Sequence, residues 1–229
     1  PSVDREELRQ ISKRMASRGP DGDGEWFSPD GQIGLAHRRL AIIDLSDKAA
    51  QPMAGKNKET AITFNGEIYN YKLLREQLEL KGYRFNSNSD TEVLLHLYDD
   101  RGEKMLDELR GMFAFAIWDG TRETLFLARD QFGIKPLYYH DDGSTLKFAS
   151  QVKALLMAKN IDSSPDPAGH VGFFLWGNIP DPYTLYKGIR ALSPGTSLLI
   201  DRSGNRKFNR FFSISAELTK IDSYLDGCS

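Results

Sequence analysis

The stretch at residues 62–70, Ile-Thr-Phe-Asn-Gly-Glu-Ile-Tyr-Asn, constrains the fold of this chain more than any other. It predicts a strand that runs into a polar turn and then into a helix, with the apolar residues on either side buried. Asn65 and Gly66 are expected where the chain bends, so that their polar groups lie at a surface or in a cleft. Asn-Gly between alternating apolar residues is also the strongest short signal of a β-hairpin, and that simpler interpretation stays open here.

The composition limits the class of protein. A chain of 229 residues that is 40% hydrophobic suits one large domain or two small ones. Its net charge of −2 argues against nucleic-acid or membrane-surface partners. The longest apolar run, 111–118, is too short to span a bilayer, and the N-terminus has no signal-peptide pattern. The single cysteine, Cys228, excludes an internal disulfide, so we expect a cytoplasmic setting and an inert terminal thiol.

Periodicity predicts how strands and helices alternate. Helices are expected at residues 4–15, 71–81, from 90 onward after a Ser89–Glu92 capping box, 104–109 and 151–159. Strands are expected around a turn at 29–31 and at 38–44, 61–64, 113–118, 124–128, 137–140, 146–149, 195–200 and 207–212. The region after residue 162 is rich in Pro and Gly, and residues 214–229 resemble a linker. Since the strands meet through short turns, we predict an α+β fold of mainly antiparallel sheets with helices packed on them.

Six motifs contain the residues whose side chains could bind a ligand or take part in catalysis. They are Arg18-Gly19-Pro20-Asp21-Gly22, then residues 37–44, 64–70, 87–92, 111–116 and 129–139. In this order the chain resembles the N-terminal glutaminase domain of the class II (N-terminal nucleophile) glutamine amidotransferases. Within that class the motifs are most similar to those of the glutamine-hydrolysing asparagine synthetases, from about residue 18 to about residue 199.

The resemblance implies a four-layer α/β/β/α sandwich, the N-terminal nucleophile hydrolase fold. It also implies that a cysteine thiolate attacks the side-chain amide of L-glutamine, that ammonia leaves, and that a glutamyl thioester is then hydrolysed. Residues 1–212 would form the glutaminase domain without its first strand, and 213–229 a linker or the truncated start of a synthetase domain. No cofactor is expected in this domain. ATP and Mg²⁺ would serve a synthetase domain in cis, whose Ser-Gly-Gly-x-Asp loop does not occur here, and a homodimer stays open.

Two charged residues match the groups that hold free glutamine in the family. A guanidinium suits a carboxylate because its fork donates two parallel hydrogen bonds, and Arg39 falls on the carboxylate-binding arginine. A solvated arginine at a strand end is the alternative. Arg38 would point to the opposite face of the same strand. Asp90 falls on the residue that binds the α-ammonium, although an acid in the first turn of a helix also stabilises the helix without any ligand.

Asn65 and Gly66 match the oxyanion hole of the family. The tetrahedral intermediate places negative charge on the amide oxygen, and donors aimed at that oxygen are often the largest catalytic contribution. Asn65 offers its side-chain NH₂ and Gly66 its backbone N–H. By the same resemblance, Glu67 and the backbone of Ile42 and Ile43 line the glutamine site. The four histidines have no metal-ligand spacing.

The nucleophile of the family mechanism is a cysteine at the mature N-terminus, and this sequence begins at Pro1. Pro1-Ser2-Val3 resembles the segment that follows the family's first strand, so we expect that strand, with its cysteine, to precede Pro1. Three alternatives stay open: a degenerate glutaminase like that of β-lactam synthetases, a module that only binds glutamine, and a catalytic Pro1. Retention of Arg39, Asn65, Gly66 and Asp90 argues against a degenerate site.

Overall fold

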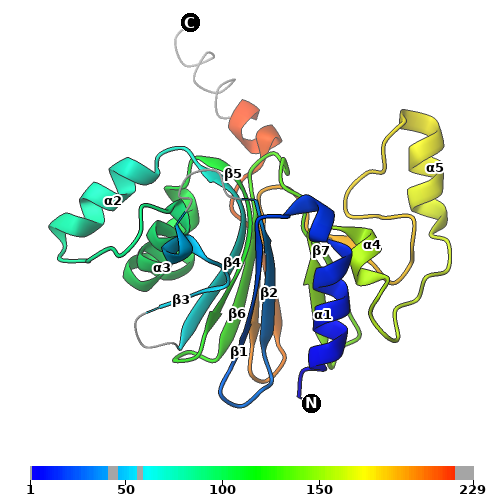
Figure 1. Ribbon diagram of the computed structural model, residues 1–229. Coiled ribbons are helices and arrows are strands. Elements are labelled where there is room, and N and C mark those ends of the chain that lie inside the picture. Colours follow the sequence, from blue (N-terminus) through cyan, green and yellow to red (C-terminus); the bar gives the residue numbers. More distant parts are fainter. Residues whose placement is uncertain (1, 41–45, 56–58, 220–229) are drawn as a thin grey trace, which may run out of the picture.

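Two layers of antiparallel strands lie between two layers of helices in the computed structural model, which describes residues 2–40, 46–55 and 59–219 (Figure 1). The first layer is a six-stranded sheet in the order β11-β10-β6-β5-β4-β3. Its strands are β3 (Met53–Ala54), β4 (Thr60–Ile68), β5 (Gly111–Asp119), β6 (Thr124–Arg129), β10 (Thr196–Asp201) and β11 (Arg206–Arg210).

The second layer is divided. Strand β1 (Gly22–Phe27) pairs with β2 (Gly34–Arg39), while β7 (Tyr138–Asp141) pairs with β8 (Leu146–Ala149) on one side and β9 (Arg190–Ala191) on the other. Among the described residues, no ladder joins β2 to β8, so each strand keeps one unpaired edge. This division creates the space in which the candidate site lies.

Helices cover the outer faces of both layers. Helices α2 (Tyr71–Leu80) and α3 (Asp90–Arg101) lie on the six-stranded sheet, and α1 (Arg5–Arg14) and α4 (Val152–Leu155) lie on the other side of the molecule (Figure 1). Helix α5 (Pro167–Trp176) stands apart from these layers, at the right of the figure. The expected α/β/β/α order is therefore present in the described chain.

Strand alternation explains the two main cores. On β5, Phe113 and Phe115 face α2 and α3, where they are fully buried with apolar residues of both helices. The intervening Ala114 and Ala116 face the second layer, where they pack with Leu127, Leu198 and other residues of β6, β7, β8 and β10. A smaller cluster fills the space between α1, α4 and β8.

Most predicted elements are confirmed, with differences that have physical causes. The bend expected at Asn65-Gly66 is wrong, because pairing with β5 keeps β4 extended through both residues to Ile68. Asn70 has the residue type of a cap and directly precedes α2, but its side chain donates to Glu108 O and accepts from Arg110 N instead of capping the helix. The 151–159 helix shortens to the four residues of α4.

The capping box at α3 is half correct. Ser89 caps the helix by accepting from Thr91 N, but Glu92 binds the backbone N–H groups of Asn86 and Ser87 rather than that of Ser89. Helix α5 is a miss in the Pro- and Gly-rich region. It begins with Asp166 as N-cap and Pro167 in the first turn, and it ends at Gly177 with φ of 67°. Those three residues are sequence signals of a helix start and a helix end, and from them α5 could have been predicted.

Candidate active site

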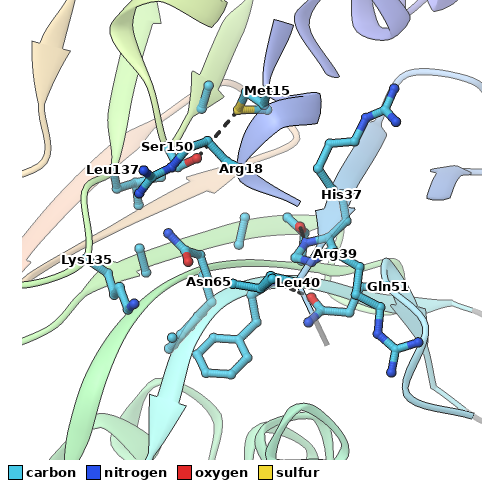
Figure 2. Close-up of a pocket in the computed structure, with 18 of the residues that line it drawn as sticks. Met15, Arg18, His37, Arg39, Leu40, Gln51, Asn65, Lys135, Leu137 and Ser150 are labelled. Atoms are coloured by element: carbon cyan, nitrogen blue, oxygen red, sulfur yellow. Dashed lines mark hydrogen bonds between the residues drawn. The ribbon is translucent and has the colours of Figure 1, made fainter. Parts of the chain in front are cut away.

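A cavity of about 400 Å³ opens where the second layer is divided (Figure 2). Strands β4 and β5 form its floor, β2 forms one wall, and residues 148–151 at the end of β8 form the opposite wall. The loop at 134–137 and the first residues of α3 complete the rim. Its volume lies in the range of small-molecule sites.

Small side chains on the floor leave this space open. Phe64 and Ile68 of β4 are buried toward the helices, so Thr63 and Asn65 face the other layer. On the neighbouring strand, the same face carries only the methyl groups of Ala114 and Ala116. The alternation of large and small residues along β5 therefore builds a packed core on one side and a cavity on the other.

The Asn65 side chain points from β4 into the cavity (Figure 2). Among the described residues, no hydrogen bond engages its amide, whereas the neighbouring side chains of Thr63 and Gln51 form hydrogen bonds within the protein. Thr63 binds His37 and Ala36 O, and Gln51 Oε1 accepts from Phe64 N at 2.7 Å. Asn65 therefore offers two N–H donors to whatever occupies the cavity.

The backbone of β4 presents a row of donors at its open edge. Phe64 N donates to Gln51 and Ile68 N donates to Asp90 Oδ2 at 3.1 Å. Because alternate N–H groups of a strand point the same way, the Gly66 N–H lies between these two on the same edge, away from β5. It lies next to the Asn65 side chain, so the two groups form a pair of adjacent donors.

Gly66 admits no side chain. A Cβ at this position would lie 2.2 Å from Met112 O and 2.8 Å from Phe113 Cα on β5. The glycine therefore permits the close approach of β4 and β5 at the point where the donors converge.

Asp90 begins α3 at the edge of the cavity and is only 4% exposed. Burial raises the pKa of its carboxyl, and the charge of Glu67 raises it further, while the hydrogen bonds from the N–H groups of Ile68 and Thr91 lower it. In the described part of the chain, the carboxyl forms no ion pair. A cationic ligand in the cavity would supply the missing counter-charge.

We expect Asp90→Asn to stabilise the fold and weaken binding. A carboxyl whose folded pKa is raised costs free energy when ionised, and this cost appears as pH rises from the unfolded value of 3.8 through the folded pKa. The melting temperature should therefore rise at pH 7 but not below pH 3.8. Loss of a charge-assisted contact of about 1.5–3 kcal/mol should weaken the binding of a cationic ligand in the cavity by roughly 10- to 150-fold. A lower melting temperature at pH 7 would contradict this.

Arg39 ends β2 at the wall of the cavity and is half-buried, and its guanidinium donates to Ser46 O at 3.0 Å. Beside it, burial and, to a lesser extent, the charge of Arg39 together lower the pKa of His37 to about 4, so His37 is neutral at pH 7. Arg38 instead donates to Ser12 of α1, as expected from strand alternation. Arg39 is thus a fixed positive charge at this wall.

The cavity brings together Arg39, Asn65, Gly66 and Asp90 from three elements. Glu67 does not line it but acts on Asp90 through its charge. Ile42, Ile43, Pro1 and Cys228 lie outside the described residues. Within the described ranges, no group of three or more His, Cys, Asp or Glu side chains is placed to hold a metal ion, and no helix is long and apolar enough to cross a bilayer.

Sequence reasoning missed several lining residues. Gln51 joins two elements by accepting from Phe64 N and donating to Thr91 Oγ1, and nothing in the polar loop around it signalled this role. Arg18 and Lys135 add cationic groups to the lining, and both fall in motifs that had no assigned function.

Known proteins with the same pattern identify the family. A family model described as a glutamine amidotransferase domain matches residues 1–212. Asparagine synthetase [glutamine-hydrolyzing] 1 of Bacillus subtilis (strain 168) is 42% identical over 212 residues, which cover 92% of this chain and 33% of the relative. Asparagine synthetase B of Escherichia coli (strain K12) is 40% identical over 174 residues, covering 75% of this chain and 30% of the relative.

A solved structure agrees with these matches. The glutamine phosphoribosylpyrophosphate amidotransferase of B. subtilis, complexed with ADP and GMP, aligns with a TM-score of 0.56 at 28% identity, covering 80% of this chain and 36% of that one. The expected N-terminal nucleophile hydrolase fold is thereby confirmed. This chain spans about a third of the length of the two curated relatives (33% and 30%), and it belongs to the family of glutamine amidotransferase domains.

Proposed function

We propose that this chain is the glutamine-hydrolysing part of an asparagine-synthetase-type amidotransferase, and that it releases ammonia for an ATP-dependent synthetase domain. The observation that carries the proposal is the cavity lined by Arg39, Asn65, Gly66 and Asp90. These four residues supply one cationic group, one anionic group and two neutral donors. Free glutamine is complementary to this set, since it carries a carboxylate, an ammonium and an amide oxygen.

Binding uses the two charged residues. Arg39 receives the α-carboxylate through its planar fork, and Asp90, ionised, receives the α-ammonium. A ligand held at both charged ends has a defined orientation, so its side-chain amide meets the donors of β4. Fixing the reacting group in this way lowers the entropic part of the barrier.

Hydrolysis then needs a nucleophile and an oxyanion site. A cysteine thiolate adds to the amide carbon, and the oxygen that becomes negative accepts from Asn65 Nδ2 and Gly66 N. The C–N bond breaks, and the nitrogen leaves as ammonia after it takes up a proton. Water then hydrolyses the thioester to glutamate and restores the thiol. None of these steps draws on a cofactor.

The open edges of β2 and β8 support the expectation that the cysteine lies on a strand before Pro1. An extended segment between them would pair with both edges and turn the divided layer into one sheet. That segment would lie directly above the floor that holds Asn65 and Gly66. We therefore propose that the nucleophile lies on such a segment and not at Cys228.

The names of the relatives support asparagine synthesis as the use of the ammonia. On this proposal the acceptor carboxylate is activated in the synthetase domain, where ATP and Mg²⁺ are needed. The whole reaction would then take place in the cytoplasm, in keeping with the single cysteine of the chain.

Glutamate release from glutamine tests this function, and Arg39→Ala tests the site with it. With the complete polypeptide that the gene encodes, we expect glutamate to form, and Arg39→Ala to raise the KM by roughly 10- to 150-fold through loss of a charge-assisted contact of about 1.5–3 kcal/mol. Arg39→Lys should restore only part of the affinity, because lysine lacks the fork.

Arg210→Ala, an exposed arginine on β11, is the matched control and should leave the KM unchanged. A polypeptide that binds glutamine without forming glutamate would favour the binding module. An unchanged KM in Arg39→Ala would refute the carboxylate assignment.

A further inference from the structure

Helix α5 is apolar on the side that faces away from the protein. Val171, Phe174 and Leu175 are 55%, 82% and 66% exposed. Their spacing of three and four residues puts them on one face. Phe173 and Trp176, which the helical spacing puts on the other side with Gly169 and Gly172, are 49% and 68% exposed. A helix that is hydrophobic all round is normally buried, so this one has the surface of an interior element.

Glycines occupy the side of α5 that faces the protein. A Cβ on Gly169 would lie 1.9 Å from Thr184 O, and one on Gly172 would lie 2.3 Å from Pro180 Cδ. The helix backbone therefore packs directly on the segment that follows it. A surface helix usually turns its large apolar residues inward and its polar residues outward. In α5 this arrangement is reversed, since Val171, Phe174 and Leu175 face outward and the glycines face inward.

Buried polar contacts hold the segment from 162 to 191 in one conformation. Asp166 is 5% exposed, caps α5 and forms an ion pair with Arg190 at 2.8 Å. The Thr184 hydroxyl donates to Ile189 O at 3.0 Å. Strand β9 at the end of the segment pairs with β7. The exposed face of α5 is therefore a fixed surface and not the product of a loose loop.

One buried arginine connects this segment to the rim of the cavity. Arg129 donates to Asp181 Oδ1 at 3.2 Å and to Leu192 O at 2.7 Å. Through its other nitrogens it donates to Gly133 O and Lys135 O, both at 2.9 Å. Lys135 lines the cavity. The side chain of Arg129 therefore contacts both the rim of the cavity and the segment that carries α5.

The size of the exposed surface indicates what covers it. With roughly 150–250 Å² for an aromatic side chain, the three residues of the outward face present on the order of 350 Å². A stable complex of separate molecules buries about 800 Å² on each partner. A domain in the same polypeptide needs less, because the tether gives an effective concentration in the millimolar range. A second copy of this chain lacks that advantage.

We propose that the outward face of α5, formed by Val171, Phe174 and Leu175, is the surface on which the synthetase domain docks. This inference rests on the proposed function, which requires such a domain, and on relatives of which this chain covers only 33% and 30%. A cavity of about 470 Å³ beside α5, lined in part by Phe173, Ile179 and Tyr183, gives the partner a recess to fill. Arg129 connects the segment that carries this face to the rim of the glutamine cavity.

Hydrogen exchange of the α5 amides tests whether the synthetase domain docks on this face. We expect exchange to be about tenfold slower or more in the complete polypeptide than in the 229-residue chain, because covering the helix suppresses its local opening. In the complete polypeptide, Val171→Ser/Phe174→Ser/Leu175→Ser should abolish that protection. It should retain glutamate release but lower the acceptor amide formed per glutamate by about tenfold. Leu80→Ser, which removes a 90% exposed leucine from α2, is the control and should change neither.

Equal exchange in both polypeptides would overturn the proposal. So would α5 protection that appears in the 229-residue chain as its concentration rises, since a second copy would then be the occupant. A complete gene product without a synthetase domain would also overturn it. Failure of the proposed function gives a different result: the complete polypeptide would form no glutamate from glutamine, whether or not the α5 amides are protected.

Discussion

Asn65→Ala in the complete polypeptide is expected to lower kcat for glutamate release by about 10²–10³, with little change in the KM. The amide of Asn65 faces the cavity without a hydrogen bond in the described chain, so its removal breaks nothing in the fold. The oxyanion exists only after attack on the amide, so the donor stabilises the transition state and not bound glutamine. Steady-state kinetics with glutamine, with glutamate measured directly, give both parameters.

Asn209→Ala is the matched control for this experiment. It makes the same substitution at an exposed position on β11, at the far edge of the same sheet, and it should leave kcat unchanged. The melting temperature of Asn65→Ala should equal that of the unmodified chain. A kcat within twofold of the unmodified enzyme would refute the oxyanion assignment.

Gly66→Ala is expected to damage both stability and activity. Its Cβ would lie 2.2 Å from Met112 O, and backbone cannot rotate away as a side chain would, so β4 and β5 must separate. Such overpacking costs about 1–3 kcal/mol, sometimes more. At about 2–4 °C per kcal/mol for a chain of this size, thermal unfolding should detect the change. The shift also moves the Gly66 N–H and the neighbouring Asn65 amide, so kcat should fall at least as far as in Asn65→Ala.

Gly55→Ala separates this effect from the general cost of replacing glycine. A Cβ at Gly55 would meet Thr60 at 3.5 Å, an ordinary contact near the other end of β4. That variant should melt close to the unmodified chain and keep its kcat. Should Gly66→Ala match it in both measurements, the close approach of β4 and β5 would have no role in the site.

Local patterns were sufficient for several parts of the fold. A helix was predicted at residues 4–15, and α1 forms there with Asp4 as its N-cap, which accepts from Glu6 N and Glu7 N. Strand β8 has the predicted limits, and the hairpin of β1 and β2 turns at the expected place. These features follow from hydrogen bonds and burial within a few residues along the chain.

Local patterns failed where partners lie far away in the sequence. Asn65-Gly66 carried a strong turn signal, yet pairing with residues 113 and 114 keeps this part of β4 extended. Asn70 had the residue type of a cap, but Glu108 and Arg110 take its side chain. Helix α5 was obscured by the prolines and glycines around it. For Asn65-Gly66 and for Asn70, a contact across dozens of residues outweighs a local preference of about 1 kcal/mol.

The sequence by itself determined the family, the likeness of its motifs to a glutaminase, and four of the residue types that the chemistry needs. Residue type and order along the chain are sufficient for that, because each motif is local. The tertiary structure decided that Arg39, Asn65, Gly66 and Asp90 line one cavity, and that burial raises the pKa of Asp90. It also decided that α5 turns its large side chains outward. Convergence, desolvation and exposure depend on which distant segments pack together, and that information is not contained in any one motif.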